Sequence, residues 1–67
     1  MDISALPEWE NKSLLELDLR KKYGVNVIAI KKNREINGSP QGANIIEKDD
    51  TLIVAGSKDS IARLESI

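Results

Sequence analysis

Residues 25–32 combine a two-residue period with β-branched side chains, which predicts a β-strand. In a regular strand, Val27 and Ala29 share one face, while Ile28 and Ile30 share the other. A strand with one solvated face normally carries polar residues on that face. Because both faces of this strand carry aliphatic side chains, we expect both faces to be covered.

A helix is predicted over about residues 14–23, before this strand. Ser13 and Glu16 match a capping box, in which serine is the N-cap residue and glutamate follows three positions later. Gly24 lies where a left-handed residue usually ends a helix. The apolar stripe of the helix repeats every four residues, at Leu15, Leu19 and Tyr23.

The rest of the chain predicts shorter elements. Residues 1–10 are expected to form an extended segment that contains a short strand. Asn33–Arg34 form a tight turn into a return strand at 35–37, and a second two-faced strand spans 51–55. Ser57 is placed to cap a final helix. The predicted order is short strand, helix, strand, hairpin strand, strand, helix.

This order predicts a single α+β domain over residues 1–67, with a small mixed or antiparallel sheet that two helices cover on one face. A chain of this length buries only about 60% of the surface that its unfolded form exposes. Leaving Ile28, Ile30 and Ile53 in water would forgo on the order of 1.5–3 kcal/mol each. We therefore expect the second sheet face to be used for homodimerisation.

Composition narrows the possible functions. The chain has no cysteine and no histidine, so disulfides are excluded, and a zinc site and the common catalytic nucleophiles and bases are not expected. Ten basic and eleven acidic residues give a net charge of −1, which argues against a DNA or RNA partner. Asp49 and Asp50 are expected to lie in a solvated turn, because a calcium loop needs more oxygen ligands. An enzyme and a metal site are therefore not expected.

The predicted hairpin carries the most distinctive surface. Basic residues, an asparagine and aliphatic side chains come together there, which is typical of a small anion site. A solvated hairpin tip above a dimer interface is the alternative. The residues concerned are Ile28, Ile30, Lys31, Lys32, Arg34, Ile36, Asn37 and Pro40.

Two stretches of the sequence resemble a known domain family. "NKSLLELDLRKKYGVNVIAIKKNREINGSP" and "IIEKDDTLIVAGSKDSIARLESI" are similar to the two conserved parts of the RCK_C domain, which is also called TrkA-C. The resemblance covers residues 11–67, and Lys48–Asp50 depart from it where the family usually has a glycine before the aspartate. The chain is most similar to the C-terminal lobe of the KtrA/KtrC type of potassium-uptake gating subunit.

The resemblance implies a cytoplasmic regulatory domain that works as a homodimer and reaches the membrane through a potassium transporter subunit. The Rossmann lobe of such subunits is absent, so its nucleotide site is not carried over. No cofactor is implied, but the resemblance implies cyclic di-AMP as a ligand at the two-fold interface. The implied contacts are Ile28, Ala29, Ile30, Lys31, Arg34, Ile36, Asn37 and Pro40.

Two alternatives remain open at this point. The chain could be a dimerisation module with no ligand, which a binding experiment would distinguish. A ubiquitin-like carrier is the other alternative, but such carriers end in a free Gly-Gly, whereas this chain continues through a helix to Ile67.

Overall fold

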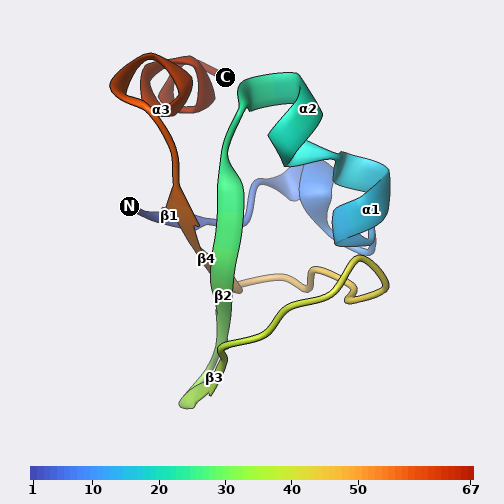
Figure 1. Cartoon of the computed structure of the whole chain (residues 1–67). Helices are drawn as coiled ribbons and strands as arrows, with labels where there is room; N and C mark the ends of the chain where they lie inside the picture. The colour runs from blue at the N-terminus through green and yellow to red at the C-terminus, as the bar shows by residue number, and fades with distance from the viewer.

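A computed structural model describes all 67 residues and contains one four-stranded antiparallel sheet (Figure 1). The strand order is β1-β4-β2-β3, so the first and fourth strands are neighbours. The predicted order of strands and the hairpin are confirmed. The strands are β1 Asp2–Ser4, β2 Asn26–Lys32, β3 Glu35–Asn37 and β4 Thr51–Ala55.

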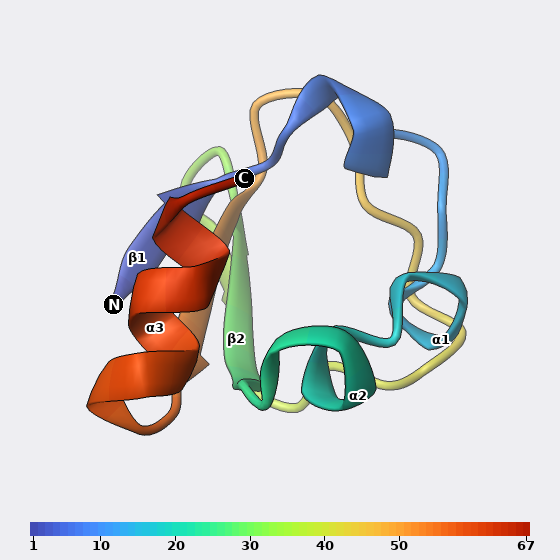
Figure 2. The same cartoon turned by 90° about the horizontal axis from the view of Figure 1, so that it is seen from above.

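Three α-helices and one 3-10 turn complete the fold. In Figure 1, α2 and α3 lie beside each other at one end of β2, and the β2–β3 hairpin projects at the other end. Seen from above, α1 and α2 lie on one side of β2, and α3 lies on the side of β1 (Figure 2). The helices are η1 Pro7–Trp9, α1 Leu14–Leu17, α2 Leu19–Tyr23 and α3 Lys58–Glu65.

The prediction of one continuous helix over 14–23 is wrong, because Asp18 divides it. Asp18 has a left-handed backbone with φ of 45°, a conformation that aspartate tolerates better than most residues. The break turns both Leu17 and Leu19 into the core, where they are 5% and 4% exposed. Leu15, which was predicted on the buried stripe, is instead 76% exposed. The predicted capping box at Ser13 and the left-handed Gly24 are both confirmed.

The prediction that Ile28 and Ile30 share a face is also wrong, because β2 contains a bulge. Val27 pairs with Val54, but the next pair in register is Ala29 with Ile53, so Ile28 has no partner on β4. An extra residue of this kind shifts the alternation of all following side chains. Ile28 is therefore 51% exposed, whereas Ile30 is fully buried.

One hydrophobic core joins the sheet to the helices. Ile30 and Leu52, which are directly paired on neighbouring strands, are both fully buried, and Leu64 of α3 is 1% exposed. Trp9 in η1 is 4% exposed and belongs to this core. Ile30 therefore needs no second subunit to cover it, and the expected dimer has to rest on other residues.

Lys32 and Asp50 form an ion pair that ties the hairpin to the turn before β4. Lys32 Nζ donates to Asp50 Oδ2 at 2.7 Å and to the backbone oxygen of Ile45 at 3.3 Å. The same Asp50 oxygen accepts the backbone N–H of Glu47 at 2.8 Å. Asp50 is only 3% exposed, so the expectation of a solvated turn is wrong for this residue. A carboxylate that accepts two donors is well compensated for its burial.

The pKa of Lys32 is raised above the ordinary lysine value of 10.5. Partial burial alone would lower this pKa, because it disfavours the charged ammonium group. The hydrogen bond and negative charge of Asp50, together with Glu47, outweigh that effect. Lys32 is therefore fully protonated at neutral pH.

Candidate ligand-binding site

The aliphatic residues predicted for a hairpin site do not lie on one surface. Ile28 and Ile36 are exposed, by 51% and 63%, and are accessible to a ligand or a second subunit. Ala29 and Ile30 are 6% and 0% exposed, so their side chains are already enclosed within the chain. Beside Ile36 and Asn37, the hairpin borders a hollow of only about 100 Å³. Pockets for small molecules usually measure about 300–1,000 Å³.

Only two of the three basic residues of the hairpin are free of ion pairs. Lys32 is held by Asp50 and Glu47, and its ammonium group faces the turn before β4. Lys31 and Arg34 are exposed, and neither forms an ion pair within the chain. The hairpin thus presents two free cations on an open surface.

The amide of Asn37 is used inside the chain. Its oxygen accepts the backbone N–H of Ser39 at 3.1 Å, and its nitrogen donates to Asn44 Oδ1 at 3.4 Å. Both functional atoms of the side chain therefore have protein partners. A direct contact from Asn37 to a ligand remains a prediction, and it would have to replace or share these bonds.

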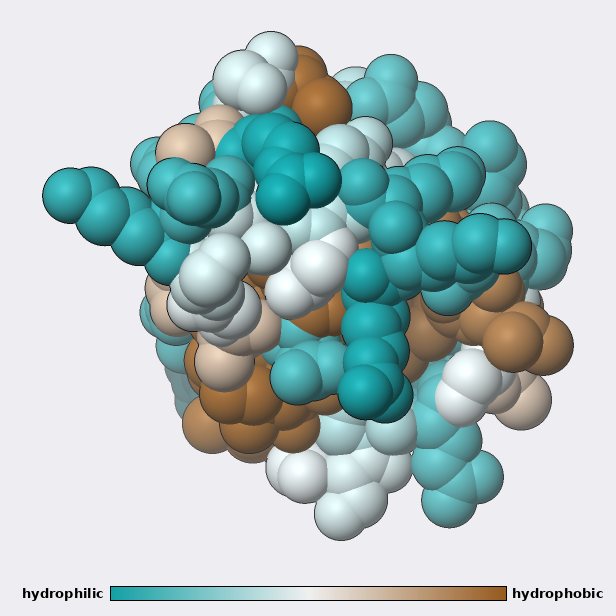
Figure 3. Space-filling model, turned by 45° about the horizontal axis from the view of Figure 1, so that its top comes forward, coloured by the Kyte–Doolittle hydropathy of each residue, from teal (hydrophilic) through white to brown (hydrophobic).

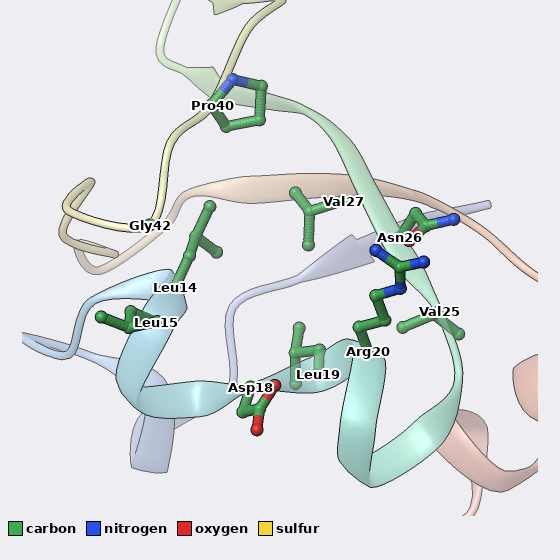
Figure 4. Close-up of a pocket in the computed structure, with 10 residues that line it drawn as sticks. All are labelled: Leu14, Leu15, Asp18, Leu19, Arg20, Val25, Asn26, Val27, Pro40 and Gly42. Carbon is green, nitrogen blue, oxygen red and sulfur yellow. The ribbon is translucent and has the colours of Figure 1, made fainter.

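Pro40 borders a different and larger hollow, of about 430 Å³, shown in Figure 4. Its walls come from α1, α2, the first half of β2 and the loop that follows the hairpin. This volume falls within the usual range for small-molecule pockets. The aliphatic part of the lining consists of Leu14, Leu15, Leu19, Val25, Val27 and Pro40.

Three polar side chains complete this hollow: Asp18, Arg20 and Asn26. All three are exposed, and none of their side chains makes a hydrogen bond or ion pair within the chain. In Figure 4, the guanidinium of Arg20 and the amide of Asn26 lie near each other on the same side of the space. A free cation and a free amide beside an aliphatic wall fit a ligand that has both an anionic group and a flat ring.

The sequence alone gives these two residues ordinary structural explanations. Arg20 fits the basic last turn of a helix, and Asn26 fits a polar position at the start of a strand. They flank the left-handed turn at Gly24, which reverses the chain between α2 and β2. A reversal of this kind brings residues on its two sides together, and that is how Arg20 and Asn26 come to share the hollow.

A second hollow, of about 500 Å³, lies between the hairpin turn and the turn before β4. Its lining contains charged and polar residues only, including Arg34, Lys48 and Asp49. A nucleobase would find no apolar contact there. No group of three or more acidic, histidine or cysteine side chains is arranged to hold a metal ion.

The surface carries hydrophobic areas in more than one place, separated by hydrophilic side chains (Figure 3). The exposed large hydrophobic residues include Leu15 at the hollow and Ile28 and Ile36 on the sheet. None of the helices is both long enough and apolar enough to cross a bilayer.

Comparison with curated proteins finds a relative among potassium uptake proteins. Ktr system potassium uptake protein C of Bacillus subtilis (strain 168) is 42% identical over 65 residues. The matched region covers 97% of this chain and 29% of that protein. The chain therefore spans less than a third of the length of this relative.

Two solved structures share the fold closely. The first is the RCK C domain of the potassium transport protein KtrA in complex with cyclic diadenosine monophosphate. It matches with a TM-score of 0.92 and 33% identity, over 98% of this chain and 78% of that one. The second is the RCK_C domain dimer of S. agalactiae BusR in complex with c-di-AMP, with a TM-score of 0.85 and 28% identity, over 98% and 90% of the two chains.

The family comparison agrees with these matches and confirms the resemblance found in the sequence. The profile of the TrkA-C domain matches residues 2–67, which is nearly the whole chain. The four-stranded antiparallel sheet and its helices are those of the solved RCK_C domains. This chain therefore belongs to the TrkA-C domain family.

Proposed function

We propose that this chain is the ligand-sensing regulatory domain of a cytoplasmic gating subunit for a potassium transporter, and that it binds cyclic di-AMP. The potassium uptake protein from Bacillus subtilis supports the transporter context. The two solved relatives in complex with cyclic di-AMP support the ligand. In this proposal the domain performs no catalysis and reaches the membrane only through its transporter partner.

The observation that carries the proposal is the 430 Å³ hollow with its free Arg20 and Asn26. Aliphatic side chains such as Leu15 and Val27 offer flat contact to an adenine ring. The Asn26 amide has both a donor and an acceptor for the edge of the base. Arg20 supplies a cation for a phosphate, and its planar group suits bidentate binding. We place the ligand here rather than at the hairpin for two reasons. The hollow beside Ile36 and Asn37 is smaller, and Asn37 already has partners. The larger hollow at the hairpin turn has no apolar lining.

Cyclic di-AMP has two equivalent halves, and a two-fold dimer presents each residue twice. One hollow per subunit would then take one adenosine half, with the two phosphates close to the symmetry axis. A ligand bound in this way contacts both subunits, so it favours the dimer geometry that brings the two hollows together. Regulation follows if the transporter is gated differently in that geometry, because a ligand shifts an equilibrium only through its differential affinity.

The location of the site is tested by a matched pair of arginine variants. Arg20→Ala should weaken binding of cyclic di-AMP by about 10- to 100-fold, because a charge-assisted contact is lost in each subunit. Arg34→Ala removes the same charge from the hairpin and should bind like the wild type. Isothermal titration of both variants at two salt concentrations measures the difference, and the contact of Arg20 with phosphate should make binding salt-dependent.

The opposite result would show that the ligand binds at the hairpin. If Arg34→Ala weakens binding and Arg20→Ala does not, the site lies with Arg34, Lys31 and Ile36. If the wild type binds neither cyclic di-AMP nor ATP, the domain is better described as a dimerisation module with no ligand.

The dimer itself is expected to use the sheet face that carries Ile36. Lys31 pairs with Ile36 and Ile30 pairs with Asn37, so Ile36 points away from the core that encloses Ile30. The wild type should show about twice the mass of one chain in light scattering at micromolar concentration. Ile36→Glu should shift that mass to the monomer and keep the fold, because it adds a charge to the interface but not to the core.

Ile67→Glu serves as the control, since Ile67 is also exposed, by 49%, but lies at the end of the chain beyond α3. It should remain dimeric. A wild-type chain that is a folded monomer at micromolar concentration would contradict this interface.

A further inference from the structure

Asn37 is the only asparagine in the chain that a glycine follows. The other asparagines precede lysine, valine, arginine and isoleucine, and they are Asn11, Asn26, Asn33 and Asn44. An asparagine side chain loses its amide when the backbone nitrogen of the next residue attacks its Cγ atom. A glycine at that next position has no side chain to hinder the attack and has the greatest conformational freedom. Asn37 and Gly38 are therefore the pair at which this reaction meets the least steric resistance.

The backbone nitrogen of Gly38 is available as the nucleophile. Its N–H makes no hydrogen bond with the backbone or with a side chain. Gly38 is exposed, and a Cβ atom placed on it would meet no atom within 4 Å. Asn37 is the last residue of β3, a strand of three residues at the edge of the sheet. The end of such a strand opens locally at a small cost in free energy, so the backbone can rotate into the geometry of attack.

The side-chain carbonyl group of Asn37 is prepared for the attack. Its oxygen accepts the backbone N–H of Ser39 at 3.1 Å. This bond forms a turn around Gly38, which keeps the asparagine side chain close to the glycine backbone. Negative charge develops on the same oxygen when a nitrogen attacks Cγ, and an N–H that already points at the oxygen stabilises that charge.

We propose that Asn37 is a site of spontaneous deamidation in the folded chain. The nitrogen of Gly38 gives its proton to solvent and bonds to Cγ of Asn37, and the bond between Cγ and the side-chain nitrogen breaks. The leaving nitrogen gains a proton from solvent and departs as ammonia, which leaves a succinimide ring. Water then opens the ring at one carbonyl group or the other and gives aspartate or isoaspartate. No oxidant, cofactor or enzyme is needed, and no ligand takes part.

Both products change the end of the hairpin. A neutral amide becomes a carboxylate, so the net charge of −1 becomes more negative by one. The carboxylate has no N–H to donate to Oδ1 of Asn44, which the amide nitrogen reaches at 3.4 Å. Isoaspartate also adds a carbon to the main chain directly after the residue that pairs with Ile30. The reaction therefore weakens the connection between the hairpin and the loop at residues 38–44.

Incubation of the whole chain in mildly alkaline buffer at physiological temperature tests the proposal. Trypsin then releases a peptide of residues 35–48, which contains both Asn37 and Asn44. Fragmentation of this peptide should locate the mass change from amide to acid at residue 37, with Asn44 intact. The two isomeric products separate in chromatography. Isoaspartate among them shows that the succinimide formed, because direct hydrolysis of the amide gives aspartate alone.

Gly38→Ala is the matched variant. The added Cβ atom meets no neighbour, and Gly38 does not have a positive φ, so the fold should be kept. The methyl group hinders the attacking nitrogen and should slow the loss of the Asn37 amide by about tenfold, which corresponds to about 1.4 kcal/mol in the activation free energy. Circular dichroism should show the same cooperative unfolding for both chains. Asn37→Asp supplies the chromatographic standard for the aspartate product.

A short peptide of residues 35–40 separates the effect of the sequence from that of the fold. In the folded chain, Asn37 should react at a rate within about tenfold of that in the peptide. Two results would overturn the inference. One is an Asn37 amide that survives in the folded chain while the peptide reacts, and the other is a Gly38→Ala chain that loses the amide as fast as the wild type.

Discussion

Replacing Ile30 with glutamate should abolish cooperative folding of the chain. Ile30 is fully buried among the core side chains. Its exposed fraction is 0%, as is that of its cross-strand partner Leu52. A carboxylate at that position would be buried with no donor to compensate it. A domain of this size has a stability of roughly 5 kcal/mol, which is less than such a burial costs. Circular dichroism on heating should show no cooperative transition.

The informative control for Ile30→Glu is Ile28→Glu, two positions earlier on the same strand. Ile28 lies at the bulge and is 51% exposed, so this variant should keep a cooperative transition. Regular alternation would give the two variants the same effect. An Ile30→Glu chain that stays folded and merely becomes monomeric would show that Ile30 lies at a subunit interface, and would contradict the core described here.

Replacing Asp50 with alanine should lower the free energy of unfolding by about 1–3 kcal/mol. The substitution removes the acceptor of Lys32 and of the Glu47 backbone N–H together. The side chain of Lys32 keeps an exposed fraction of 36%, so water partly replaces the lost partner and holds the effect below that of a fully buried pair. In a domain of this size the melting temperature should fall by roughly 5–20 °C.

Two asparagine variants separate the charge of Asp50 from its position in the turn. Asp50→Asn keeps an acceptor and should cost less than Asp50→Ala, whereas Asp49→Asn should change little because Asp49 is exposed. Asparagine also tolerates the positive φ of 70° at Asp49. A melting temperature that falls equally in Asp49→Asn and Asp50→Asn would contradict a specific role of the buried carboxylate.

The same pair gives the stability a dependence on pH. The pKa of Lys32 is higher in the folded chain than its ordinary value of 10.5. The contribution of the pair is therefore fully present below that value and is lost as the pH rises through the folded pKa. The resulting alkaline decline should be smaller in Asp50→Asn.

Element order was predictable from the sequence because each element carries a local signal. The two-residue period, the capping box at Ser13 and the glycine at 24 depend on neighbours within a few positions. The family resemblance rested on the same local spacings. These signals can be recognised without knowing which elements pack against each other in the fold.

The divided helix and the bulge were not predictable in that way. A left-handed Asp18 is unfavourable locally, and it is maintained because it lets both Leu17 and Leu19 reach the core. Similarly, the bulge at Ile28 is visible only in the register of β2 against β4. Both depend on tertiary contacts that outweigh local preference.

The location of the ligand site stays a prediction. The sequence indicated a cation, an amide and an aliphatic floor at the hairpin, and Pro40 lies beside the 430 Å³ hollow. The cation and amide in that hollow are Arg20 and Asn26, whereas the hairpin offered Arg34 and Asn37 as an equally plausible pair. The reversal at Gly24 and the path of the loop after the hairpin explain why Arg20 and Asn26 share this hollow.

The hollow is built from segments that are separated along the chain: α1 and α2, the start of β2, and the loop at Pro40. A ligand that touches all of them has no binding site on the unfolded chain. It therefore adds to the stability by about 2.7 kcal/mol at a hundred times its dissociation constant. In a domain of 67 residues that increment is a large share of the total. Under the proposed function, copies without ligand would unfold more often and meet cellular proteases sooner, so the abundance of the domain would follow the concentration of its ligand.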